Sequence, residues 1–143
     1  MRRIATLALI VGSLSGRALC QYAAEFSSYY SGDRYDFRLT HEQVSNTPAW
    51  LEDAPNPPLS ARSAKDIAVV YLNKLFDDAS GWSVVEIGLV PVAERWVYLI
   101  SFTAPKRHDC QDCVYTRFRV VVTMDGVAAT GTKLHREPPP PRQ

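Results

Sequence analysis

The second half of the chain alternates between apolar and polar positions in the way that consecutive β-strands do. The first such segment places Val85, Ile87 and Leu89 on one face. The second segment is apolar on both faces, which is typical of a central strand that is covered twice. The pattern predicts an antiparallel meander of three or four strands, the last of them weak. The predicted strands are residues 82–90, 96–104, 114–124 and 127–133.

Turn residues separate these predicted strands. Pro91 ends the first strand, and residues 92–95 form a connection of hairpin size. Asp125 and Gly126 predict a two-residue hairpin turn, because this dipeptide accepts the positive φ angles that such a turn requires. Residues 105–113 make a longer, polar connection.

A helical period precedes the sheet, over residues 60–76. Ser60 or Ser63 can cap this helix, because a serine at a helix start accepts a hydrogen bond from a backbone N–H. Gly81 offers a stop beyond its end. Apolar residues recur at steps of three and four, so the helix has one face to bury against the strands that follow. These residues are Ala64, Ile67, Ala68, Tyr71, Leu72 and Leu75.

Together these elements indicate an α+β domain over residues 60–134, in which one helix packs on a three- to four-stranded antiparallel meander sheet. The second face of this sheet is expected to show Glu86, Arg117, Arg119 and Thr123, with cross-strand ion pairing. The order of elements resembles that of cystatin-like, NTF2-like and PepSY-like domains. The resemblance is one of architecture alone, because no segment matches a motif of those families, and it implies no site residue.

Residues 21–59 are rich in aromatic residues and, towards their end, in proline. Four of the seven tyrosines lie here, residues 31–33 (Ser-Gly-Asp) predict a turn, and residues 34–39 alternate strictly enough for one short strand. Residues 40–43 have helix-starting character, whereas residues 53–58 favour an extended linker because each proline disfavours helix in the residue before it. We expect this segment to cover the second face of the sheet; the alternative is an aromatic recognition arm.

The first twenty residues have the layout of a secretory signal peptide. Arg2 and Arg3 precede a short apolar run, and small residues follow it. The run has roughly half of the ~20 residues that a membrane-spanning helix needs. We therefore expect residues 1–20 to be a signal peptide, cleaved after Ala18 or after Cys20, and the protein to be secreted or periplasmic, touching a membrane only during export. A lipid anchor at Cys20 is disfavoured, because the residues just before it are not all small.

Charge excludes one class of partner. The whole chain has 16 basic and 15 acidic side chains, a formal net charge of +1. Three of the basic side chains lie within residues 1–20, so the mature chain has 13 basic and 15 acidic groups and a net charge of −2. Such a chain has no overall attraction for nucleic acid, and we expect none as a partner.

Cys110 and Cys113 form the one chemical motif of interest, and three interpretations stay open. A redox-active dithiol needs a stabilised thiolate, but Asp109 and Asp112 beside the cysteines raise the energy of one. A zinc site needs four ligands, and no second pair of ligands has the right spacing. A disulfide that closes a short loop in an oxidising compartment is the favoured interpretation. The alternative state is two free thiols.

Lys106, Arg107 and His108 form a small basic loop next to this motif. These side chains are candidates for contact with an anion or a partner, but solvated charge is the favoured interpretation. The sequence contains no glycine-rich phosphate loop and no motif of serine hydrolases or zinc proteases. We therefore predict no catalytic residue, no metal and no cofactor.

Residues 135–143 form a proline-rich tail that we expect to be disordered. The sequence as a whole favours an exported, non-enzymatic binding or interaction module, with an unknown protein or small ligand as its partner. One alternative is an exported thiol-disulfide redox protein that uses Cys110 and Cys113. The other is an NTF2-like pocket protein for a small molecule.

Overall fold

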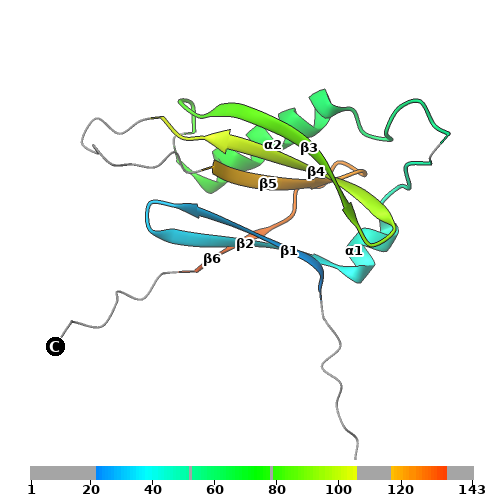
Figure 1. Cartoon of the computed structure of the whole chain (residues 1–143). Coiled ribbons are helices and arrows are strands. Elements are labelled where there is room, and N and C mark those ends of the chain that lie inside the picture. Colours follow the sequence, from blue (N-terminus) through cyan, green and yellow to red (C-terminus); the bar gives the residue numbers. More distant parts are fainter. Residues whose placement is uncertain (1–21, 52, 78, 106–116, 135–143) are drawn as a thin grey trace, which may run out of the picture.

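The computed structural model describes residues 22–51, 53–77, 79–105 and 117–134. The elements in these ranges are β1 (Tyr22–Tyr30), β2 (Asp33–Thr40), α1 (His41–Asn46), α2 (Ala61–Leu75), β3 (Ser83–Val92), β4 (Arg95–Thr103), β5 (Arg117–Thr123) and β6 (Gly131–Leu134). They form two three-stranded antiparallel sheets, of strand order β1-β2-β6 and β3-β4-β5, with α2 against the second sheet (Figure 1). The predicted α+β class is confirmed.

Helix α2 forms where the sequence predicts it. The Ser60 side chain caps its first turn, accepting a hydrogen bond from the backbone N–H of Ser63 at 3.1 Å. Ala64, Ala68 and Leu72 are buried, with exposed fractions of 2% or less. Two alanines in this stripe let the helix backbone lie close to the sheet, because their side chains occupy little space between the two layers.

Strand β4 lies between β3 and β5, as its double-sided apolar pattern predicts. Tyr98 and Ile100 are buried on the side that faces α2, and the Tyr98 hydroxyl donates a hydrogen bond to the Leu59 carbonyl oxygen at 2.8 Å. On the second face Ser101 is buried too. The core therefore extends over both faces of this strand.

The second face is only partly covered. Glu86 of β3 and Arg117 of β5 form the expected cross-strand ion pair, at 3.2 Å, and both side chains are exposed. Val121 and Thr123 follow the two arginines on the same face of β5, but both are buried, so the expected exposure of Thr123 is wrong. On this face the Arg117 and Arg119 end of β5 is exposed, whereas Gly88 and Val90 of β3 are half-buried. Cover is therefore present at β4 and at the Thr123 end of β5, and partial at β3.

The predicted fourth strand of the meander is wrong. Strand β6 pairs with β2 in the other sheet, and the single bridge between Val122 and Ala128 is what remains of the expected pairing with β5. Gly131 explains the crossing: a Cβ atom there would lie 2.9 Å from the Phe37 ring, so only glycine lets β6 approach β2.

The predicted turn at Asp125 and Gly126 is present but longer than expected. The Gly126 N–H donates to the Thr123 carbonyl oxygen, and the Thr123 N–H donates to the Val127 carbonyl oxygen, both at 2.9 Å. Three residues thus separate the paired Thr123 and Val127. Of Asp125 and Gly126, only Gly126 has a positive φ, of 82°.

The aromatic segment is a β-hairpin rather than a single short strand. Ser31 and Gly32 both have positive φ, 54° and 87°, which is the turn geometry that joins β1 to β2. Short helix α1 follows, and Thr40 and Gln43 form a complete capping box at its start. Sequence alone predicts the turn, the second strand and the helix start, but it misses β1, whose serines and alanines give a weak apolar alternation.

The two sheets meet at the edge of β5 that faces away from β4. The Ser28 hydroxyl of β1 lies against this edge: it accepts a hydrogen bond from the Arg119 N–H at 2.8 Å and lies 3.2 Å from the Arg119 carbonyl oxygen. Ser28 is 2% exposed. The hairpin therefore packs along the edge of β5. From this position its side chains can contact side chains on either face of that strand.

Phe118 fills the junction between the sheets and α2. Its ring is fully buried and contacts the rings of Tyr35 and Phe37 from β2, and those of Phe76 and Trp82 from the connection after α2. The centroid distances lie between 5.2 and 5.9 Å, with edge-to-face geometry. One side chain thus joins three separate parts of the chain.

Replacing this ring should cost a large part of the stability. We expect Phe118→Ala to lower the free energy of unfolding by about 3–5 kcal/mol, because it removes a buried ring and leaves a cavity. Urea unfolding followed by tryptophan fluorescence measures the change. Val85→Ala, on the exposed side of β3, is the control and should stay within about 0.5 kcal/mol of the parent. Equal effects from the two variants would contradict a central role for Phe118.

Candidate functional site

The residues that the sequence singles out for chemistry lie outside the described residues. These are Lys106, Arg107, His108, Cys110 and Cys113. The predicted disulfide and the predicted basic contact therefore stay predictions, as do the signal peptide and the tail. The candidate site in the described part of the chain is a different one.

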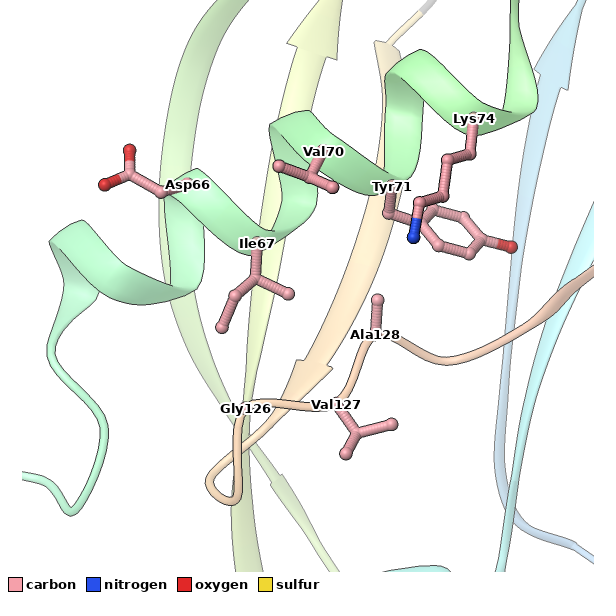
Figure 2. A pocket seen from close by; sticks show the side chains of 8 residues that line it. All are labelled: Asp66, Ile67, Val70, Tyr71, Lys74, Gly126, Val127 and Ala128. Atoms are coloured by element: carbon pink, nitrogen blue, oxygen red, sulfur yellow. The ribbon is translucent and has the colours of Figure 1, made fainter.

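A groove runs between one flank of α2 and the turn that follows β5 (Figure 2). Its volume is about 520 Å³. Val70 on the helix and Val127 on the turn are more than half exposed, at 55% and 54%. The groove is lined by Asp66, Ile67, Val70, Tyr71, Lys74, Gly126, Val127 and Ala128.

The helix period places these side chains on one flank. Ile67, Val70, Tyr71 and Lys74 follow one another at steps of three, one and three residues, which puts them beside the buried stripe rather than within it. The opposite wall lies next to the helix: a Cβ atom at Gly126 would be in ordinary contact with the Ile67 Cδ1 atom, at 3.4 Å. Glycine is favoured at this position by its positive φ of 82°.

Polar groups gather at the end of the groove near Tyr71. The Tyr71 hydroxyl accepts a hydrogen bond from the Gly131 N–H at 2.7 Å, so its own hydrogen remains available to a further acceptor. The Lys74 side chain extends beside the Tyr71 ring (Figure 2) and has no ion-pair partner among the described residues. Asp66, near the other end, is paired with Lys65 at 3.3 Å.

A second hollow, of about 240 Å³, lies between α1 and the same turn. Three of its polar side chains have partners within the chain: the Thr123 hydroxyl bonds to Asp125 and to the Val127 carbonyl oxygen, and Gln43 belongs to the capping box. This hollow is therefore part of the structural framework. Val127 lines both cavities.

The outer face of the hairpin carries a charged network centred on Asp36, which is 1% exposed. Arg34 donates to its Oδ1 atom from Nε at 2.6 Å and Ser27 donates at 2.8 Å. Oδ2 has no hydrogen bond in the described part of the chain, and the Arg38 guanidinium lies 3.6 Å from it. Glu25 pairs with both arginines.

The charge balance of this network identifies it as structural. Burial by itself raises the pKa of the Asp36 carboxyl, but the hydrogen bonds from Arg34 and Ser27 and the charges of Arg34 and Arg38 outweigh it and hold that pKa below its ordinary value. Two acidic and two basic groups neutralise one another, and the buried Oδ2 atom is out of reach of a ligand.

Two further features are absent from the described residues. None of them form a helix that is long and apolar enough to cross a membrane. They also contain no cluster of three or more His, Cys, Asp or Glu side chains placed to hold a metal ion. Comparisons with known protein families, with curated proteins and with solved structures find no significant match to this chain.

Sequence reasoning missed the groove. Ile67 and Tyr71 are assigned to the buried stripe by their spacing, and Val127 to a strand. The available signal was Val70, an apolar residue that widens the stripe beyond what one sheet can cover, followed four residues later by Lys74. The facing wall depends on where the chain crosses to the other sheet, which local pattern does not show.

The Asp36 network makes stability depend on pH in a defined direction. Because its pKa is lowered on folding, Asp36 stabilises the fold above pH ~4, the ordinary range of a carboxyl, and this contribution disappears as the pH falls through the folded-state value. We expect Asp36→Asn to lower the free energy of unfolding at pH 7 by about 2 kcal/mol and to flatten its decline below pH ~4. Urea unfolding over a pH series measures both effects.

Asp53→Asn is the matched control, because Asp53 is exposed and outside the network. It should leave both the stability at pH 7 and the acid slope close to those of the parent. If Asp36→Asn behaved like this control, the network would contribute nothing to the fold.

Proposed function

We propose that the chain is exported and acts as a non-enzymatic binding module whose groove holds a small ligand with an apolar body and one anionic end. The observation that carries this proposal is the apolar groove between α2 and the turn, with an ammonium group and a hydroxyl donor at one end. Export is supported by the pattern of residues 1–20.

The apolar part of the ligand follows from the lining. A volume of about 520 Å³ lies within the range of sites for small molecules, which are usually apolar with a few well-placed polar groups. Val70 and Val127 leave more than half of their surface in water in the unoccupied chain. Covering them with a hydrocarbon body would be favourable at roughly 25 cal/mol per Å² of apolar surface.

The anionic end follows from the charges. Lys74 lacks an acidic partner among the described residues, whereas Asp66 is already paired with Lys65. The Tyr71 hydroxyl adds a donor near the ammonium, since the Gly131 N–H occupies only one of its acceptor positions. A carboxylate or phosphate placed there would receive charge-assisted hydrogen bonds, which are stronger than neutral ones.

The charge of the ligand's polar end can be tested at a constant chain length. We expect the full chain to bind n-decanoate saturably, n-decanol more weakly, and decyltrimethylammonium most weakly of the three. Isothermal titration calorimetry gives the affinities, and perturbed amide signals of α2 and of residues 126–128 give the location. Decanoate binding without any preference over the cationic probe would overturn the anionic part of the proposal.

Lys74→Met tests how much the positive charge of Lys74 contributes to binding. It should weaken decanoate binding about fivefold, the effect of ~1 kcal/mol for a partly exposed ion pair, and leave decanol binding unchanged. Arg62→Met is the matched control, because Arg62 is an exposed cation on the same helix, lies outside the groove lining and is not paired with Asp66. The proposal fails if both variants weaken decanoate equally.

Val127→Glu tests whether the ligand binds in the groove. A carboxylate in the apolar wall repels an anionic ligand, and covering that carboxylate costs desolvation free energy. We expect decanoate binding to be lost while the far-ultraviolet circular dichroism stays that of the parent. Leu51→Glu, at an equally exposed apolar position away from the groove, is the control. Unchanged binding by Val127→Glu would place the ligand elsewhere.

A further inference from the structure

The outer edge of β3 is open. In the sheet of order β3-β4-β5, the described residues contain no strand that pairs with β3 on the side away from β4 (Figure 1). Two apolar side chains of this strand, Val85 and Ile87, are 49% and 39% exposed. An open edge presents unpaired backbone donors and acceptors, and these form a template for a further strand.

The register shows which backbone groups of β3 point outward. The Ser28 hydroxyl bonds to the backbone N–H and C=O groups of Arg119. These backbone groups therefore point away from β4, where the register partner of Arg119 is Ser101. Ser101 therefore points towards β3, and the alternation of antiparallel pairing makes Gly88 point towards β4 and Ile87 point outward.

Pro91 agrees with this assignment, because a proline without an N–H is tolerated at an outward position of an edge strand. By the same alternation Leu89 points outward. The backbone N–H and C=O groups of Ile87 and Leu89 are thus the ones that an added strand can reach.

Two features limit the usable part of this edge. The register shifts between Val84 and Glu86, which leaves Val85 as the extra residue of a bulge. Pro91 removes a donor at the other end. Natural proteins use such devices to shorten open edges, and here they leave a regular window of residues 86–90. The centre of that window is Gly88.

We propose that this window is a self-association surface, in which β3 pairs in antiparallel fashion with β3 of a second copy of the chain around a two-fold axis at Gly88. Ile87 then pairs with Leu89 of the second copy, and Leu89 with its Ile87. Each of these two pairs is of the hydrogen-bonded kind and exchanges both backbone bonds. The result is one continuous sheet through both copies, with an interface that is identical on each side.

The side chains of the window suit a second copy better than an unrelated strand. The exposed Ile87 side chain is placed beside Leu89 of the second copy on the helix-facing side, where cross-strand apolar pairs stabilise a sheet. Glu86 is the only charged residue of the window, and the two-fold axis puts Val90 opposite it. No like charges therefore meet, and Glu86 keeps its ion pair with Arg117 of its own chain.

The first test is the mass of the full chain in solution, measured by sedimentation equilibrium as a function of concentration. We expect a reversible dimer. Ile87→Lys should make it monomeric, because it places two ammonium groups in the apolar part of the interface, while Val127→Glu, in the groove, should leave the dimer intact. A chain that is monomeric at every concentration overturns the proposal, as does a dimer that Ile87→Lys leaves unchanged.

The second test determines the register of the pairing between the two β3 strands. It does not require the Ile87→Lys variant to fold. In a chain whose Cys20, Cys110 and Cys113 are replaced by serine, Gly88→Cys should form a disulfide across the two-fold axis. Directly opposed residues of a non-hydrogen-bonded pair have Cα atoms ~4.5 Å apart, within the range for a disulfide. The position accepts the side chain, since a Cβ atom there would meet only the Leu99 carbonyl oxygen, at 3.8 Å.

Ser83→Cys in the same background is the matched control. Its two copies would lie about 30 Å apart in the proposed pairing, because five residues separate each from the axis. Rapid cross-linking by Gly88→Cys and not by Ser83→Cys supports the proposal. Equal rates, or faster cross-linking by Ser83→Cys, would show that β3 does not pair with itself around Gly88.

Discussion

The structure depends first on the burial of one ring. Phe118 comes from β5, yet its neighbours belong to β2 and to the connection between α2 and β3. Within the described residues neither sheet has a helix on each side, so each leaves an apolar face that the other must help to cover. The edge-to-face contacts of Phe118 help to cover both faces. Rings of the hairpin pack against it on one side, and rings that follow α2 pack against it on the other.

The two edge strands of the sheet β3-β4-β5 differ in whether their outward backbone groups have hydrogen-bond partners. At β5 the outward groups are satisfied within the chain: Ser28 bonds to Arg119, the Ala129 N–H donates to Val121, and the Val127 carbonyl accepts from Thr123. Three groups, one from β1 and two from the segment after β5, thus bond to the outward backbone groups of β5. At β3 the described residues supply a bulge and a proline, which shorten the edge without covering it. This asymmetry makes β3 the edge of this sheet that the proposed self-association uses.

Local pattern was sufficient for the elements whose partners are close in sequence. Helix α2 and the central strand β4 follow from spacing and from apolar residues on both faces, and the hairpin turn at Gly32 from its composition. The pattern failed for β6, since its choice between β5 and β2 is decided by the contact of Gly131 with the Phe37 ring, 94 residues earlier. The groove depends on that same choice, so Ile67 and Tyr71 were recognised as apolar but not as part of a site.

The segment that follows β5 therefore serves the fold and the candidate site together. Its first residues close the β5 edge through Thr123 and Val127, its middle forms the outer wall of the groove, and its end pairs with β2. Tyr71 connects these roles, because its hydroxyl holds the Gly131 N–H at the start of β6 and its side chain also lines the groove. A ligand of the proposed kind that bonded to this hydroxyl would act on the point where the chain leaves one sheet for the other. The proposal therefore implies that occupancy of the groove and docking of β6 on β2 are energetically linked.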